Sequence, residues 1–148
     1  MAGRHDDVVG GDGRRLRWQE HNHARQQVII DAAVRVLERA EPGHEVQVQQ
    51  IADEAGLART VIYRHFHDRT ELDRAVQERI CADLGARLLP QLSYDDRPVE
   101  VIRRVVHALV TWAEEHRTLF WFAELDLPGP GPGPCPRRPS RSSGGSRS

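Results

Sequence analysis

The spacing of apolar residues predicts a chain built from helices, the first of which is the clearest. From about Ala24 to Ala40, apolar side chains recur at the offsets of one helix face: Val28, Ile29, Ala32, Ala33, Val36, Leu37 and Ala40. Pro42 and Gly43 follow, and proline cannot continue the hydrogen-bond ladder of a helix. The pattern therefore predicts an amphipathic helix that ends before residue 42.

Two short helices with a glycine between them are predicted next. A two-turn helix is indicated by Val48, Ile51, Ala52 and Ala55 and closes at Gly56, whose missing Cβ permits a left-handed exit. Ile62 and Phe66 mark the inner side of a second short helix, over about residues 58–66, and Leu57 can plug the angle between the two. This order, within residues 50–72, is that of a helix-turn-helix.

Three longer stretches complete the predicted all-α fold. Asp68 and Glu71 have the spacing of a capping box, which starts a fourth helix. Its apolar stripe is Leu72, Ala75, Val76, Ile80, Leu84 and Leu88, and Pro90 stops it. Pro98 is acceptable in the first turn of a fifth helix, with a stripe at Ile102, Val105, Val106, Leu109, Trp112 and Ala113. A sixth helix should begin near Thr118.

The two ends of the chain differ from the helical middle. Residues 1–20 are predicted to be disordered or a basic arm, because a Gly- and Asp-rich start leads into RRLRW at 14–18, which is interpreted as an arm along DNA or as a solvated lead-in. Residues 128–148 are mostly Pro, Gly, Ser and Arg and are predicted to be disordered. Between them we expect a DNA-binding domain at 21–80 and a partial helical effector or dimerisation domain at 81–127.

Charge and composition limit the kinds of functional site that we expect in this chain. The net charge is −1 and every side-chain cation other than histidine is arginine, so a nucleic-acid site has to be a local patch. The two cysteines are far apart and have neither the spacing of a zinc site nor that of a disulfide framework. The two histidines of each His-x-His pair (His21 and His23, His65 and His67) point to different sides of a helix, and no catalytic motif is present. No signal region or span of about 20 apolar residues occurs. We therefore expect a non-enzymatic, cofactor-free cytoplasmic protein.

The predicted second helix of the helix-turn-helix carries the candidate DNA contacts. Arg59, Thr60, Tyr63 and Arg64 share a helical arc, and Asp68 is the only acid between Arg59 and Arg69. Arginine can donate to guanine or phosphate, and a tyrosine ring can contact a thymine methyl. The alternative is a helical hairpin whose polar face simply meets water.

The stretch GLARTVIYRHFHDRTEL, preceded by DAAVRVLE and VQQIADEAG, resembles the tetracycline-repressor (TetR) family of bacterial regulators over about residues 24–84. The resemblance implies a homodimeric repressor that reads a double-stranded operator with its third helix in the major groove and responds to a small-molecule effector. By position it adds Gln49 to the base readers Arg59, Thr60, Tyr63 and Arg64, and makes phosphate anchors of His65 and Arg69. Trp112, Phe120 and Trp121 are candidate effector-pocket residues, although such aromatic runs more often pack in a core or interface.

The sequence departs from the family pattern at several positions. Gln47 and Ala58 replace the usual capping residues of the second and third helices, and Val61 stands where a hydroxyl often touches phosphate. The PGPGPG stretch replaces the later helices that usually build the dimer, so a truncation or frameshift is expected and homodimerisation is in doubt. The alternative function is a helical interaction protein that does not bind DNA, or an inactive fragment that pairs with an intact regulator.

Overall fold

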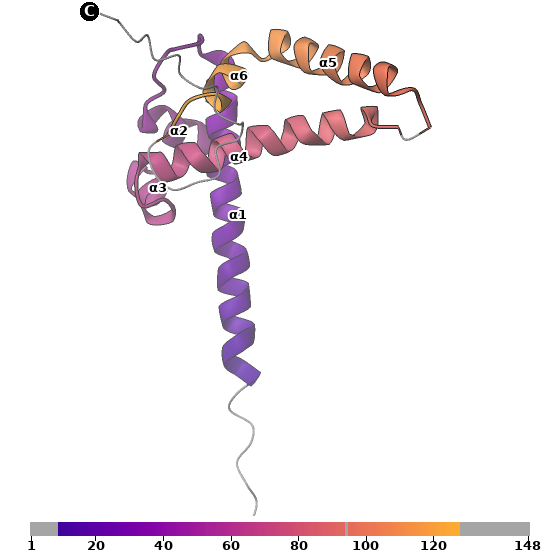
Figure 1. Cartoon of the computed structure of the whole chain (residues 1–148). Coiled ribbons are helices and arrows are strands. Elements are labelled where there is room, and N and C mark those ends of the chain that lie inside the picture. The colour runs from indigo at the N-terminus through magenta and orange to yellow at the C-terminus, as the bar shows by residue number, and fades with distance from the viewer. Residues whose placement is uncertain (1–8, 94, 128–148) are drawn as a thin grey trace, which may run out of the picture.

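The computed structural model describes residues 9–93 and 95–127, and every regular element in these ranges is a helix (Figure 1). The predicted tail at 128–148 lies outside them. The elements in chain order are α1 (Val9–Arg39), α2 (Val48–Ala55), α3 (Arg59–His65), α4 (Arg69–Leu88), the 3₁₀ helix η1 (Leu89–Gln91), α5 (Pro98–Glu115) and α6 (Arg117–Ala123). The all-α prediction is confirmed.

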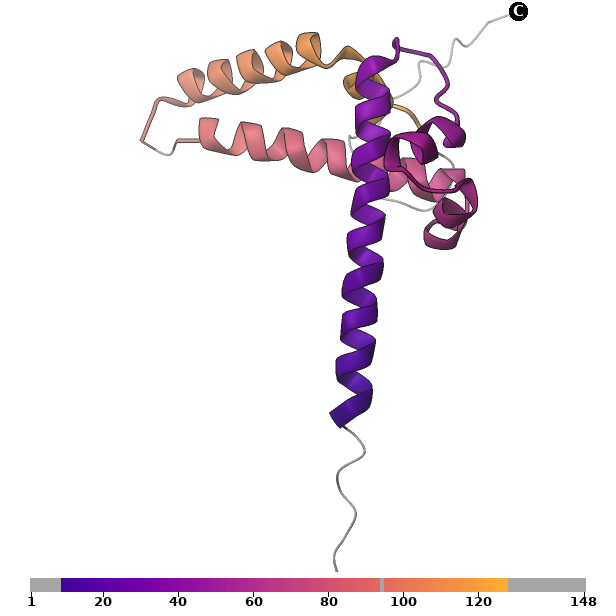
Figure 2. The same ribbon diagram turned by 180° about the vertical axis from the view of Figure 1, so that it is seen from behind.

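Helix α1 begins much earlier than the sequence pattern predicted. It starts at Val9 rather than near Ala24, so residues 9–13, which were expected to be disordered, are helical, while residues 1–8 lie outside the described part. The basic arm at 14–18 stays a prediction. The physical reason is that the 14–20 run consists of Arg, Leu, Trp, Gln and Glu, which are acceptable or good helix formers. They extend the helix without an apolar face. In both views this first half of α1 stands apart from the other helices (Figures 1 and 2).

The second half of α1 forms the centre of the hydrophobic core. It packs against α2, α3, α4 and α6. The face is rotated from the predicted one, since Val28 is exposed and Ile30 is buried in its place. The buried apolar residues of the described part are Ile29, Ile30, Ala32, Ala33, Leu37, Val46, Val48, Ile51, Ala52, Ile62, Phe66, Leu72, Val76, Ile80, Trp112, Leu119 and Phe122.

The turn between α2 and α3 has the predicted form. Gly56 adopts a left-handed conformation with φ of 66°, which favours glycine, and the Leu57 N–H donates to the Ala52 carbonyl at 2.9 Å. Leu57 packs against the core, as expected. Ala58 occupies the N-cap of α3 and provides no side-chain hydrogen bond. The orientation of α3 therefore depends on its buried side.

Helix α4 is capped as predicted. The Asp68 carboxylate accepts from the Glu71 N–H at 2.8 Å, and the Glu71 side chain accepts from the backbone N–H of His67. The helix ends at Leu88, just ahead of Pro90 in η1. Residue 80, the predicted domain boundary, lies inside α4, so one continuous helix connects the two predicted domains.

Helix α5 begins at Pro98 as predicted but buries little of its apolar stripe. Trp112 is its buried residue, whereas Ile102 and Val106 of the predicted stripe are exposed, together with Val99 and Val110. The reason is that α5 packs on α4 and α6 from one side, and none of the described elements covers the other. These four exposed residues form a row along α5.

Two polar side chains fasten α6 to the earlier helices. Gln77 of α4 is buried, and its Nε2 donates to the carbonyls of Phe122 and Leu125, each at 2.9 Å. The Thr118 hydroxyl donates to the Ala40 carbonyl at the end of α1, at 2.7 Å. Because buried carbonyls need partners, these bonds fix α6 in place.

Replacing Gln77 should loosen this attachment. We expect Gln77→Ala to lower the free energy of unfolding by about 1–3 kcal/mol, because it removes a buried donor that bonds the Phe122 and Leu125 carbonyls. Urea unfolding followed by circular dichroism measures the change. Gln19→Ala, on the exposed first half of α1, is the matched control and should change stability by less than about 0.5 kcal/mol. Equal effects of the two variants would contradict this role for Gln77.

Candidate nucleic-acid interface

The outer face of α3 presents the predicted reader residues together. Arg59, Thr60, Tyr63 and Arg64 are all exposed, whereas Ile62 on the opposite side is only 1% exposed. The guanidinium carbon of Arg59 lies 5.7 Å from the centroid of the Tyr63 ring, a cation–π distance. The two side chains therefore form one joint surface that is cationic and planar.

The arginines of this face have no carboxylate partner within the described residues. Ion pairs bind the side chains of several other arginines: Arg35, Arg39, Arg69, Arg79, Arg103 and Arg104. No such pair involves Arg59 or Arg64. Their charge is thus available to an anionic ligand.

Gln49 and Arg69 are less available than the α3 residues. The side-chain amide of Gln49 donates to Asp53 Oδ1 at 2.8 Å, within α2. Arg69 Nε donates to Asp73 Oδ1 at 2.7 Å, and its Nη1 donates to the Val46 carbonyl at 2.6 Å. Burial raises the pKa of Asp73, although the bond from Arg69 opposes this shift. Arg69 therefore ties α4 to the segment before α2 in the free chain.

His65, at the end of α3, is held from α1. Gln26 Nε2 donates to the His65 carbonyl at 3.1 Å, and His65 Nδ1 is buried with no hydrogen-bond partner among the described residues. Burial lowers the pKa of His65, and the positive charges of Arg25, Arg64 and His21 lower it further. A phosphate contact by His65 near neutral pH would use an N–H donor rather than a full charge.

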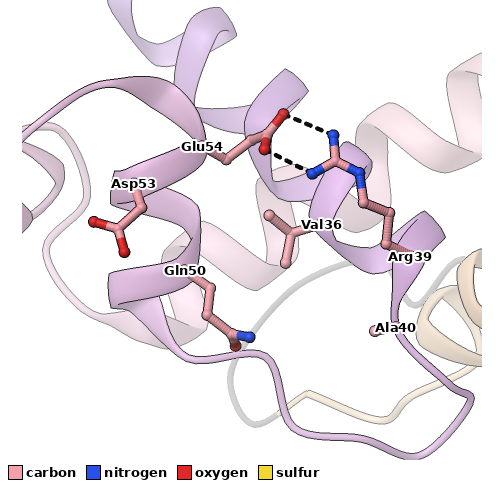
Figure 3. A pocket seen from close by; sticks show the side chains of 6 residues that line it. All are labelled: Val36, Arg39, Ala40, Gln50, Asp53 and Glu54. Atoms are coloured by element: carbon pink, nitrogen blue, oxygen red, sulfur yellow. Dashed lines mark hydrogen bonds and ion pairs between the residues drawn. The ribbon is translucent and has the colours of Figure 1, made fainter.

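Helix α2 is clamped to α1 by a carboxylate between two arginines. Glu54 accepts from Arg39 through both oxygens, at 2.8 and 3.0 Å (Figure 3), and from Arg35 at 2.8 Å. The bonds from Arg39 and then Arg35 lower the pKa of Glu54 to about 2. The clamp borders an open hollow of about 410 Å³, which is lined by Val36, Arg39, Ala40, Gln50, Asp53 and Glu54.

The effector-pocket candidates are separated by the fold. Trp112 is buried, with its ring centroid 5.3 Å from that of His116, whereas Phe120 and Trp121 are exposed on α6. A hollow of about 320 Å³ near the junction of α5 and α6 contains none of the three in its lining. In the described ranges, no group of three His, Cys, Asp or Glu side chains is placed to hold a metal ion. No described helix is long and apolar enough to cross a membrane.

Comparison with known proteins agrees with this geometry. Residues 29–76 match the family model of bacterial regulatory proteins, tetR family, a segment that runs from the core of α1 through α3 into α4. This chain belongs to the TetR family. It is 31% identical over 104 residues to an uncharacterised HTH-type transcriptional regulator of Mycobacterium tuberculosis. The aligned segment covers 70% of this chain and 44% of that protein.

Two further matches extend the comparison. The nucleoid occlusion factor SlmA of Vibrio vulnificus is 27% identical over 92 residues, 62% of this chain and 47% of SlmA. The crystal structure of a TetR family transcription regulator from Marinobacter aquaeolei shares the fold, with a TM-score of 0.56 and 23% identity over 72% of this chain and 55% of the other. The chain thus spans less than half the length of these curated relatives.

Sequence reasoning missed the residues that position α3. Gln26 and Arg25 lie in the predicted first helix, but nothing in the sequence shows that they approach His65. Glu54 is the centre of the α1–α2 clamp, a role that its place on a short helix beside Asp53 does not reveal. The available signal was a pair of arginines four residues apart, Arg35 and Arg39, which share one face of a helix.

Loss of the Glu54 charge should weaken the clamp in a pH-dependent way. A carboxylate whose folded pKa is about 2 stabilises the fold fully above its unfolded pKa of about 4.3, and it loses this effect as the pH falls toward 2. We expect Glu54→Gln to lower Tm at pH 7 and the difference from wild type to shrink on acidification. Glu100→Gln, which removes only an exposed pair with Arg103, is the control. A Tm difference that stays constant with pH would contradict the assignment.

Proposed function

We propose that this chain is a sequence-specific DNA-binding transcriptional regulator, a repressor of TetR type that inserts α3 into the major groove of an operator. The observation that carries the proposal is the α3 face: four exposed side chains, including two arginines without a carboxylate partner in the described part, on a helix anchored by Ile62 within the family segment. The major groove is about 12 Å wide and admits one helix.

The position of each side chain along α3 suggests its role. Arg59 and Thr60 lie in the first turn, where recognition helices usually contact base edges. Arg59 can bind both acceptors of a guanine, and the ring of Tyr63 beside it can cover a thymine methyl. Arg64 follows as a further candidate base reader, and His65 lies at the far end, where a contact to phosphate would set the register.

The link between α4 and α6 supports control by an effector. Gln77 holds the end of α6, and α4 begins at Arg69, four residues after α3 ends. A ligand that displaced α6 would therefore move α4 and, with it, α3. Of the three candidate effector-pocket residues, Trp112 is buried, whereas Phe120 and Trp121 are exposed on α6, so such a ligand would contact α6 from its exposed side.

Binding as a dimer completes the proposal. One α3 helix makes too few base contacts to exceed the non-specific affinity of about 10⁻⁴ to 10⁻⁶ M, whereas two linked readers bind successive major grooves. We expect sedimentation equilibrium with a selected operator to give two chains per duplex. A complex of one chain per duplex with nanomolar affinity would contradict this expectation.

Removing Arg59 should relax the sequence preference at the base pair that it contacts. Selection of bound duplexes from a random-sequence pool with the full chain would yield the operator. We expect Arg59→Ala to weaken operator binding by about 1–3 kcal/mol and to lose discrimination at one base pair, because a bidentate contact is lost. Fluorescence anisotropy measures both effects, and Arg87→Ala, an exposed arginine far along α4, is the control.

The same experiment separates this function from the alternative of an interaction protein that does not bind DNA. That alternative predicts no enriched sequence in the selection. It also predicts identical duplex affinities for wild type, Arg59→Ala and Arg87→Ala.

A further inference from the structure

The first half of α1 carries a basic stripe that the reader helix does not use. The side chains of Arg14, Arg17, Trp18, His21 and Arg25 recur at offsets of 0, 3, 4, 7 and 11 residues. At 3.6 residues per turn they lie on one face of the helix, over about 16 Å of its length. We call this set the α1 stripe. Asp12 lies on the opposite side of the helix, and Glu20 lies beyond the edge of the stripe.

This stripe has no function in the fold of the described residues. Arg14, Arg17, Trp18 and His21 are exposed, Trp18 by 67%, and the helix stands apart from the core here (Figures 1 and 2). Within the described part, the one bond from its arginines is local, from Arg17 Nε to the Gly13 carbonyl at 3.3 Å. No carboxylate in these ranges pairs with Arg14, Arg17 or Arg25. An exposed row of cations that stabilises nothing internally is available to an anionic partner.

The stripe is continuous with the α3 reader surface. Arg25 and His21 lie close enough to His65 to lower its pKa, as does Arg64 of α3 itself. Gln26, next to Arg25, bonds the last carbonyl of α3. The positive surface therefore runs from Arg64 at the end of α3 onto Arg25 and His21, and along the free helix to Arg17 and Arg14.

We propose that the α1 stripe binds the phosphate backbone of duplex DNA beside the site that α3 reads, an inference that rests on the proposed function. The partner is set by charge complementarity and by continuity with the α3 face. With α3 in the major groove, the near end of the stripe lies at the edge of that groove. Its length of about 16 Å corresponds to about five base pairs of flanking duplex at 3.4 Å each. Trp18, between the arginines, lies against the sugar-phosphate surface.

The salt dependence of duplex binding tests the stripe without knowledge of the operator. Each phosphate contact contributes about 0.9 to the slope of log affinity against log salt concentration. On a 30-base-pair random-sequence duplex (length about 100 Å), we expect R14Q/R17Q to lower the slope of the full chain by about 1.8. The control R87Q/R117Q removes the same net charge from exposed positions on α4 and α6 and should leave the slope near wild type.

A spectroscopic measurement reports on the stripe independently of affinity. Trp18→Phe should remove the part of the DNA-induced tryptophan fluorescence change that comes from the stripe, and it leaves Trp112 and Trp121 in place. An undiminished change in Trp18→Phe would overturn the contact assigned to Trp18.

The possible results distinguish the inference from the proposed function. An unchanged slope in R14Q/R17Q, or an equal fall in both double variants, would overturn the inference alone, because the wild-type chain still binds duplex. Failure of the wild-type chain to bind duplex even at low salt would overturn both. If Arg59→Ala loses base preference while R14Q/R17Q keeps the wild-type salt slope, the proposed function of α3 is supported and the DNA contact of the α1 stripe is overturned.

Discussion

Helix α3 is too short to hold its own conformation, and the surrounding structure depends on that constraint. Isolated helices shorter than about 12–15 residues are marginal in water, and α3 has 7, with an alanine in place of a capping side chain. Its stability comes from tertiary contacts. Ile62 and Phe66 are buried beneath it, and Gln26 of α1 bonds its last carbonyl. The side chains on the outer face of α3 take no part in these stabilising contacts.

The same contacts make α1 and α4 the two helices that hold α3 in place. Helix α1 holds α2 through the Glu54 clamp and α3 through Gln26. Helix α4 starts from the Asp68 cap directly after α3 and continues to the α6 attachment at Gln77. The α4 segment from Asp68 to Gln77 therefore connects α3 to α6, and the buried amide of Gln77 makes the polar contact at its far end.

The sequence was sufficient for elements whose signals are local. The Gly56 turn, the Asp68 cap, Pro98 in a first turn and the buried pair Ile62 and Phe66 each follow from short-range stereochemistry. The reach of α1 back to Val9 was missed, since its first half has no apolar face and its glycines favoured disorder. Long-range partners were also missed, because the distance between Gln26 and His65, or between Gln77 and Phe122, depends on how the helices cross.

The distribution of ion pairs explains how a chain of net charge −1 can present a positive surface. Several arginines on the body of the molecule pair with neighbouring acids: Arg79 pairs with Asp31 and Asp83, and Arg104 pairs with Asp96. On the α3 face and along the free half of α1, the described structure pairs no arginine with an acid. At an ionic strength near 0.1 M, charges more than about 10 Å apart barely interact. The potential that a phosphate meets is therefore set by these local cations, and the acids elsewhere on the molecule contribute little to it.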